Sequence, residues 1–288
     1  MERHGAALEI LFEDRELLVC RKPAGLPVQS ASFGTKDMVS MLRTYLAEKG
    51  AKGGVPYVGV VHRLDQPVEG VIVFAKNQKS AAGLSAQAAD GRMEKVYQAV
   101  VLGNPGPEGH LTDWLLKDGR TNTSRVVEPG TKGAKKAELS YRTLAEKDGK
   151  TLVEIRLHTG RHHQIRVQFA KMGTPLWGDR KYGPAAPAAA PSGETERPQA
   201  SVEATVPSGE AERPQASVEV TAPSGNTGRP QMPAPAADSA VRPRTVALCA
   251  VRLTFAHPSN GKKMTFSCAP RGDGFQDFLQ GDAFQDFQ

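Results

Sequence analysis

Residues 61–76, VHRLDQPVEGVIVFAK, decide how this chain is interpreted. They place Asp65 in a turn directly before a continuous apolar run, which is typical of a buried strand. An aspartate in a turn often caps the backbone that follows it. The alternative is a carboxylate held in position for chemistry, and other segments of the chain bear on that choice.

Two other segments contain residues suited to the same site. Residues 91–101, GRMEKVYQAVV, have the period-two alternation of a strand, which puts Lys95 and Tyr97 on one side. Residues 159–183, TGRHHQIRVQFAKMGTPLWGDRKYG, contain Arg166 at the start of a predicted helix. The first segment therefore predicts a polar strand face, and the second contains an arginine that could pair with a carboxylate.

Together, the three motifs resemble the RluA-type family of RNA pseudouridine synthases, and the resemblance covers residues 8–183 and 246–270. It implies the α+β pseudouridine synthase fold, in which a mixed, largely antiparallel bent sheet with flanking helices carries a central RNA-binding cleft. It also implies an isomerase that converts specific uridines in RNA to pseudouridine. The reaction changes no oxidation state, so we expect no cofactor and no metal.

The resemblance assigns the catalytic role to Asp65. The reaction breaks the bond from ribose C1′ to base N1, rotates the base and rejoins it through C5. A carboxylate beside C1′ can stabilise or trap positive charge there, as in glycoside chemistry. It can also remove the C2′ proton so that a glycal forms, and the sequence leaves both routes open.

Three more residues of the base pocket follow from the resemblance. Arg166 is the expected salt-bridge partner of Asp65, with a phosphate contact as the alternative. Tyr97 is expected to pack against the target base and to be able to remove the C5 proton. Ile165 would complete the pocket. The alternative for Tyr97 and Ile165 is an ordinary place in the core.

The expected partner is RNA, a stem-loop of ribosomal or transfer RNA whose target uridine leaves its stack. Arg63, Lys95 and Arg161 are the predicted substrate-binding residues. The chain has a formal net charge of +6, while residues 184–243 and 272–288 are acidic overall. The remaining residues are therefore strongly basic, as in a phosphate-binding protein.

Composition excludes several other classes. The first twenty residues contain no uninterrupted apolar segment of signal-peptide or membrane-spanning length, so we expect a cytoplasmic protein without membrane contact. We also expect a monomer. The three cysteines are far apart and lack the paired spacing of a thiolate metal site, so we expect them to be buried and reduced. The histidines at 62, 162 and 163 are assigned to turn structure or backbone contacts.

Residues 184–243 have no aromatic residue and no Leu or Ile, but hold eleven of the 21 prolines. They also contain a tandem repeat with a period of 16 residues, starting as PSGETERPQASVEATV at Pro191. Such a segment cannot bury a core, so we predict a disordered insertion in a surface loop. The catalytic domain would then comprise residues 1–183 and 244–271, followed by an acidic tail, 272–288, interpreted as a frayed end in preference to a docking helix.

Local patterns predict mostly hairpin-linked strands and three helices, which indicates the α+β class. The predicted helices span about 36–49, 80–89 and 162–172. The predicted strands form a pair within 8–23, single strands at 68–75 and 94–102, a pair at 136–145 and 151–158, and a final pair within 246–270.

One departure from the family pattern motivates competing hypotheses. The usual Thr-Ser-Gly after HRLD is Val68-Glu69-Gly70 here, which adds a carboxylate beside the catalytic loop. A catalytically silent RNA-binding protein that keeps the fold is therefore the main alternative. A glycosidase using Asp65 and Glu69 is a third hypothesis, but strand alternation and the lack of nearby sugar-stacking tryptophans argue against it.

Overall fold

The apolar run after Asp65 forms strand β4 (Glu69–Ala75), in which all seven residues are buried. This explains why the run shows no polar alternation, since a strand covered on both faces is apolar throughout. The structure is a computed structural model that describes residues 8–30, 34–50, 54–184 and 245–279. These residues all belong to one compact unit, which combines the chain before residue 186 with the chain after residue 238.

Eleven strands form one sheet in the order β1-β2-β4-β10-β5-β9-β8-β6-β7, with β11 paired to β10 and β3 paired to β4. The other strands are β1 (Glu9–Glu13), β2 (Leu17–Lys22), β3 (Gly59–Val60), β5 (Glu94–Leu102), β6 (Glu108–Asp118), β7 (Thr123–Val127), β8 (Lys135–Lys147), β9 (Lys150–Leu157), β10 (Leu248–Ala256) and β11 (Lys263–Ser267). The helices are α1 (Met38–Glu48), α2 (Gln78–Ala89), α3 (Gln164–Lys171) and the short 3-10 helix η1 (Asp273–Phe275).

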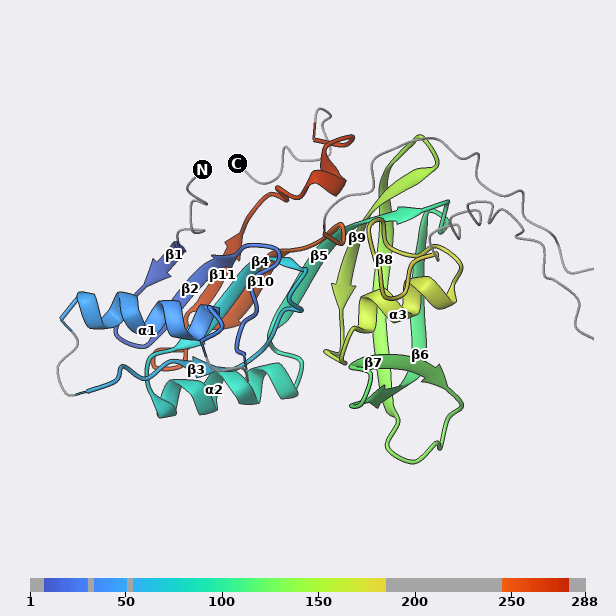
Figure 1. The fold of residues 1–288 in the computed structure, drawn as a ribbon. Coiled ribbons are helices and arrows are strands. Elements are labelled where there is room, and N and C mark those ends of the chain that lie inside the picture. The colour runs from blue at the N-terminus through green and yellow to red at the C-terminus, as the bar shows by residue number, and fades with distance from the viewer. Residues whose placement is uncertain (1–7, 31–33, 51–53, 185–244, 280–288) are drawn as a thin grey trace, which may run out of the picture. The chain divides into compact units, whose positions relative to one another are not determined.

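The predicted α+β class with a largely antiparallel sheet is confirmed. Among the described strands, β4 and β10 form the one parallel pair. Figure 1 shows α1 and α2 beside the half of the sheet that contains β2 and β4, and α3 beside the half that contains β6 and β8. The predicted turn between β8 and β9 has Asp148 and Gly149 at φ of 50° and 69°, as a two-residue hairpin turn requires.

Strand β10 lies in the middle of the sheet, between β4 and β5, although it follows the predicted insertion in sequence. Its approach to β4 explains Gly70, which has a φ of 126° and pairs with Ala250. A Cβ on Gly70 would lie 2.5 Å from the backbone nitrogen of Ala250. Only glycine combines this conformation with so close a contact.

Among the described residues, two large hydrophobic clusters and a small third one, of Leu115, Ala137 and Val167, form the core. One large cluster contains Leu64, Tyr97 and Ile165 from the region that later forms the site. The other large cluster contains Phe275 and Phe278. The three cysteines are buried and unpaired, as predicted. None of the helices in the described ranges combines the length and apolar character that crossing a bilayer requires.

The interpretation of the tail as a frayed end is wrong for residues 272–279. Phe275 is 1% exposed and Phe278 is 5% exposed, and Lys150 Nζ lies 2.8 Å from Asp277 Oδ2. The sequence pattern suggested fraying because aspartates lie close to Phe275 and Phe278, so the segment shows no clear apolar pattern. Residues 280–288 lie outside the described residues, as does the predicted insertion apart from Pro184.

The hairpin of β6 and β7 was not predicted from the sequence. Along β6, buried and exposed residues alternate only in part, and the polar sequence of its turn resembles a loop. Asn122, directly before β7, adopts a left-handed φ of 52°, which asparagine tolerates better than most residues. This hairpin forms the edge of the sheet next to α3 and contributes Lys117 and Asn122 to the cavity described below.

Candidate active site

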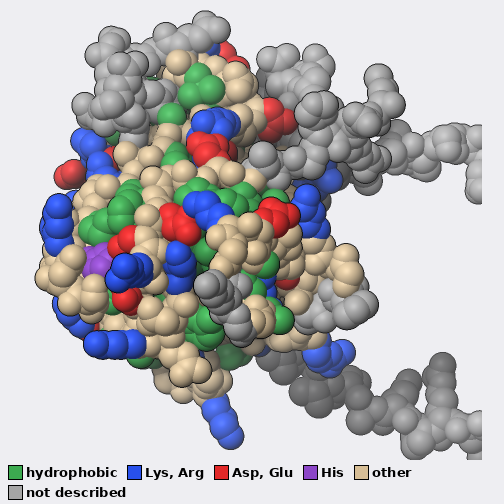
Figure 2. Space-filling view, turned by 90° about the vertical axis from the view of Figure 1, so that its left-hand side faces the viewer, with side chains coloured by type: hydrophobic (Ala, Val, Ile, Leu, Met, Phe, Trp, Pro, Cys, Tyr) green, Lys and Arg blue, Asp and Glu red, His purple; other side chains and the backbone are tan. Residues whose placement is uncertain are grey.

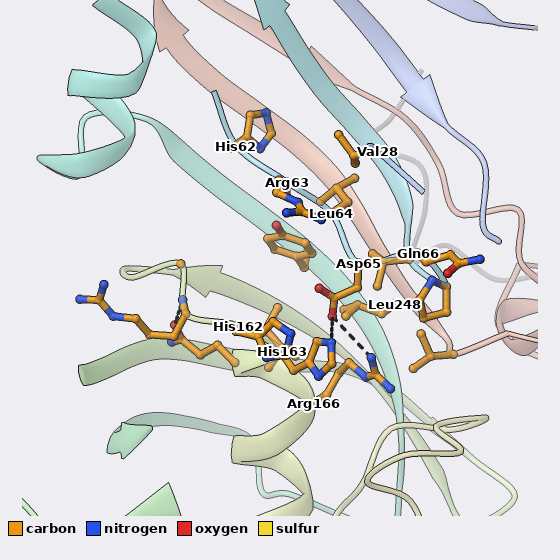
Figure 3. A pocket seen from close by; sticks show the side chains of 18 of the residues that line it. Val28, His62, Arg63, Leu64, Asp65, Gln66, His162, His163, Arg166 and Leu248 are labelled. Carbon is orange, nitrogen blue, oxygen red and sulfur yellow. Dashed lines mark hydrogen bonds and ion pairs between the residues drawn. The ribbon is translucent and has the colours of Figure 1, made fainter. Parts of the chain in front are cut away.

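A cavity of about 1470 Å³ opens between the loop before β4, the start of β5 and the start of α3. It exceeds the range of about 300–1,000 Å³ that is usual for small-molecule pockets. Figure 3 shows Asp65 on one wall, directed toward His163 and Arg166 on the other. All seven predicted site residues line the cavity: Arg63, Asp65, Lys95, Tyr97, Arg161, Ile165 and Arg166.

The backbone, not the side chain, of Asp65 stabilises its turn. Val68 N–H donates to Asp65 O at 3.0 Å, while Lys22 Nζ and Gly25 N–H donate to Gln66 O at 3.0 and 2.8 Å. Within the described residues, the Asp65 carboxylate accepts no hydrogen bond from a backbone N–H. The turn-capping alternative therefore fails, and the carboxylate is available for another role.

The surroundings of Asp65 affect its charge in two opposing ways. Its side chain is 27% exposed, and burial raises the pKa of the carboxyl above its ordinary value. The positive charges of Arg166 and Lys22 act in the opposite direction and favour the carboxylate. Burial is the larger influence on the pKa of Asp65, so the arginine partly compensates for the loss of water.

Arg166 has a stronger partner than the predicted one. Its Nε and Nη2 donate to Asp179 Oδ2 and Oδ1 at 2.7 Å each, whereas its Nη1 lies 3.5 Å from Asp65 Oδ2. Asp179 also accepts the backbone N–H groups of Lys181 and Tyr182, at 2.8 and 3.1 Å. The contact with Asp65 is present, but it is the weaker of the two carboxylate contacts of Arg166.

Asp179 lies within the motif of residues 159–183 but is not among the predicted site residues. A sequence signal for Asp179 exists but is local: the residue follows Arg166 by 13 positions and begins a turn that ends at Gly183. The buried arginine pairing and the two backbone hydrogen bonds lower the pKa of Asp179 despite its burial. Asp179 is therefore ionised and orients Arg166 in the cavity wall.

The histidines differ from one another. His62 Nε2 accepts the backbone N–H of Val73 at 3.2 Å, which confirms the predicted backbone contact. His162 and His163 lie in a turn, as predicted, but their rings contact side chains and not the backbone. His162 contacts Ser124 Oγ at 2.9 Å and Asn122 Oδ1 at 3.1 Å.

His163 lies next to the catalytic candidate itself. Its Nε2 is 3.6 Å from Asp65 Oδ2, and its Nδ1 is 2.7 Å from the hydroxyl of Tyr182. The His162 ring stacks on it with centroids 3.7 Å apart. The contacts of His163 with Asp65 and Tyr182 join residues distant in sequence, so no local pattern predicts them.

Strand β5 supplies the predicted polar face. Lys95 and Tyr97 both line the cavity, as the alternation indicated. Tyr97 is 7% exposed, and burial, followed by the charge of Asp65, raises the pKa of its phenol. Burial lowers the pKa of Lys95, which makes no ion pair with any described residue. Ile165 is buried and belongs to the same core as Tyr97, so it is both a core residue and part of the cavity wall.

Glu69 does not line the cavity. Its carboxylate lies 3.1 Å from Arg21 Nη2 and accepts the backbone N–H groups of Arg271 and Gly272 at 2.9 and 2.7 Å. The residue that replaces serine in the family motif therefore fixes the C-terminal segment to β2 and β4. A glycosidase would need Glu69 as a second acid in the cavity, so that hypothesis fails. The hypothesis of a catalytically silent protein rested mainly on Glu69 and is weakened for the same reason.

The charge of the cavity suits a polyanion. Its lining includes seven basic side chains and one acidic side chain, that of Asp65. Arg63 is exposed, and Arg161 is exposed with its Nε donating to Lys136 O at 2.8 Å. On the face in Figure 2, by contrast, lysine and arginine side chains are interspersed with aspartate and glutamate. Phosphate contacts are therefore expected in the cavity.

The family model described as RNA pseudouridylate synthase matches residues 16–171. Ribosomal large subunit pseudouridine synthase D of Zymomonas mobilis is 39% identical over 179 residues, which is 61% of this chain and 56% of that protein. Its namesake in Pseudomonas aeruginosa is 36% identical over 177 residues, 61% of this chain and 53% of that protein. The chain thus spans about half the length of these curated relatives.

A solved structure of human RNA Pseudouridylate Synthase Domain Containing 1 has the same fold. The TM-score is 0.60 at 18% identity, and the match covers 94% of this chain and 86% of that one. The fold predicted from the sequence motifs is thereby confirmed.

Proposed function

The chain belongs to the RNA pseudouridylate synthase family, and from that membership we propose that it isomerises uridine to pseudouridine in RNA through Asp65. The observation that supports this proposal most directly is the Asp65 carboxylate. It caps no described backbone, faces an arginine at 3.5 Å and is the one acid in a basic cavity. A partly buried carboxylate without a structural role is a candidate for chemistry.

In the proposed reaction, the N1–C1′ bond of the target uridine breaks, the base rotates, and a C5–C1′ bond forms. The C5 proton is lost and N1 gains a proton, so atoms and charge balance without an oxidant. The ionised Asp65 either stabilises or traps charge at C1′ or takes the C2′ proton. Arg166 favours the charged form of Asp65 against the effect of burial, and Asp179 keeps Arg166 in place.

We assign the base-stacking role to Tyr97 and the apolar wall of the base pocket to Ile165. The raised pKa of Tyr97 favours the neutral phenol, which offers a flat face and a hydroxyl at its edge. Such a phenol is suited to stacking throughout the reaction. Its removal of the C5 proton would require a partner that accepts the phenolic proton in turn.

The proposed substrate is a ribosomal or transfer RNA stem-loop with the uridine flipped out of its stack. Flipping costs a few kcal/mol, which stacking and phosphate contacts offset. Lys95, Arg63 and Arg161 are the proposed phosphate contacts. Lys95 is the best supported, because it is a half-buried cation without an ion-pair partner in the described residues. The names of the relatives make ribosomal RNA the first substrate to test.

We further propose one catalytic domain, residues 1–183 and 244–271, interrupted by the insertion 184–243. The pairing of β10 with both β4 and β5 supports this arrangement. Two more observations agree with a cytoplasmic monomer. The cysteines are unpaired, as is usual in a reducing compartment, and the exposed large apolar residues of the described chain are Val55 and Tyr57.

The test uses purified full-length protein and unmodified transcripts of ribosomal and transfer RNA, incubated separately, with pseudouridine then mapped at nucleotide resolution. We expect one or a few new sites that depend on the protein. If the protein binds these RNAs but creates no pseudouridine in any of them, the catalytically silent RNA-binding alternative replaces the proposal.

A further inference from the structure

A chain of hydrogen bonds leads from strand β7 to the edge of the catalytic carboxylate. The backbone N–H of Ser124 donates to the Tyr182 oxygen at 2.8 Å. The same hydroxyl lies 2.7 Å from Nδ1 of His163. On the far side of the ring, Nε2 faces Asp65 Oδ2 (Figure 3), and these two atoms are 3.6 Å apart.

These contacts favour one position for the proton of the neutral His163 ring. The Tyr182 oxygen already accepts the Ser124 N–H, so its own proton is available for donation, and His163 Nδ1 is the acceptor within reach. An Nδ1 that accepts leaves the proton on Nε2. In this tautomer, the proton of the neutral ring faces Asp65.

The ring is neutral for an independent reason. Burial, followed by the charge of Arg166, lowers the pKa of His163 to about 3. A neutral imidazole can donate a hydrogen bond to Asp65 without giving the carboxylate a second full positive counter-charge. The stacked His162 and the edge of the Tyr182 ring hold the imidazole from two sides.

The two contacts of Asp65 converge on one oxygen. Both His163 Nε2 and Arg166 Nη1 approach Oδ2, at 3.6 and 3.5 Å. Within the described residues, Oδ1 has no hydrogen-bond partner. A carboxylate held by one oxygen presents the other to a ligand.

Resting on the proposed function, we propose that His163 is a positioning residue for Asp65: with RNA bound, it donates its Nε2–H to Oδ2 and directs Oδ1 at the ribose. At 3.6 Å the contact is too long for a hydrogen bond in the free protein. Contacts of this kind often tighten only in the substrate complex. Asp65 lies on the loop before β4 and His163 at the start of α3, so a small approach of the two walls would close the gap.

The alternative is a backbone role. His163 precedes α3 with a left-handed φ of 53° and makes no side-chain cap, and asparagine is favoured in this conformation. Two substitutions separate the roles. In His163→Gln the amide nitrogen can occupy the Nε2 position and still donate to Asp65, whereas in His163→Asn the shorter side chain reaches only the Nδ1 position.

The experiment compares wild type, His163→Gln and His163→Asn in single-turnover pseudouridine formation, RNA affinity and thermal midpoint. The proposal expects Gln to stay within about tenfold of wild type in rate and Asn to lose about 100-fold, the cost of a misplaced group, with RNA affinity changed less than about threefold. The thermal midpoint of the Asn variant should be at least that of the Gln variant, since its backbone preference is better. If Asn is as active as Gln or more active, the role belongs to the backbone and the proposal is overturned.

A second measurement does not depend on activity. Ring nitrogen NMR of protein labelled with ¹⁵N-histidine should show His163 neutral and protonated on Nε2, and its signal should shift in Asp65→Asn. A proton on Nδ1 would overturn the proposal even if the wild type is active. A wild type that forms no pseudouridine in any RNA instead refutes the proposed function, and the two failures are thereby distinguished.

Discussion

The guanidinium of Arg166 holds the carboxylate of Asp179 through two hydrogen bonds, each 2.7 Å long. This bidentate pair is buried and fixes the plane of the guanidinium. The remaining nitrogen, Nη1, is thereby directed toward Asp65. The catalytic candidate thus depends on a carboxylate that it does not touch.

Removing the charge of Asp179 should change the pH dependence of catalysis. The negative charge of Asp179 raises the pKa of Asp65, so Asp179→Asn should lower it, and the acidic limb of kcat/KM should move to lower pH. The rate at its plateau should fall, because the amide of the variant can still accept one hydrogen bond from Arg166 and keep it beside Asp65, but orients the guanidinium less firmly than the carboxylate does. The measurement is the pH profile of kcat/KM, and an acidic limb that stays in place or moves to higher pH would contradict the account.

Asp113→Asn is the matched control, since Asp113 is also a buried carboxylate, pairs with Lys171 and does not line the cavity. It should leave the acidic limb unchanged. Asp179→Asn should also destabilise the fold, by about 3–5 kcal/mol for a broken buried pair. The pKa of Asp179 is lowered in the folded state, so its stabilisation is present above the unfolded pKa and is lost as pH falls through the folded one.

Glu69 should matter for stability and not for chemistry. Glu69→Gln weakens the contact with Arg21 and the two backbone hydrogen bonds from Arg271 and Gly272. We expect a loss of about 3 kcal/mol in the free energy of unfolding, measured by urea denaturation, with kcat unchanged where the variant is folded. Glu94→Gln, whose partner Lys263 is exposed and 3.7 Å away, should cost less than about 0.5 kcal/mol. A folded Glu69→Gln variant with a large loss of kcat would place Glu69 in the catalytic machinery after all.

How far the sequence predicts the structure depends on the range of the interaction. The buried strand after Asp65, the alternation that pairs Lys95 with Tyr97, and the turn at Asp148 are local patterns, and all three are confirmed. The hairpin of β6 and β7 was missed because its turn is polar and its alternation incomplete. Tertiary pairing with β8 decides its structure, and that pairing has no local signal.

The site shows the same division. The motifs predict Asp65, Tyr97 and Arg166 as site residues, and all three line one cavity. The orientation of Arg166 by Asp179 and the contact of His163 with Asp65 were not predicted. Each depends on which groups the fold places within a few ångströms, and for His163 the partner is about 100 residues away in sequence.

Lys95 should be a phosphate contact. Lys95→Gln removes a half-buried cation that has no ion-pair partner among the described residues, so RNA affinity should fall. The slope of log affinity against log salt should become shallower by about 0.7–0.9, the counterion release of one phosphate. Filter binding over a series of salt concentrations measures this slope. Lys263→Gln, which removes an exposed lysine outside the cavity, should leave the slope unchanged, and an equal effect of both substitutions would refute a specific contact.

The most direct measurement of the central claim is the release of tritium from RNA labelled at uridine C5, because forming the C5–C1′ bond displaces that hydrogen. Wild type and Asp148→Asn, which changes an exposed aspartate in a hairpin turn, should release tritium at the same rate. Asp65→Asn should bind the RNA with nearly unchanged affinity and release no tritium above background. Tritium release by Asp65→Asn at a rate close to that of Asp148→Asn would contradict the claim that the Asp65 carboxylate performs the isomerisation.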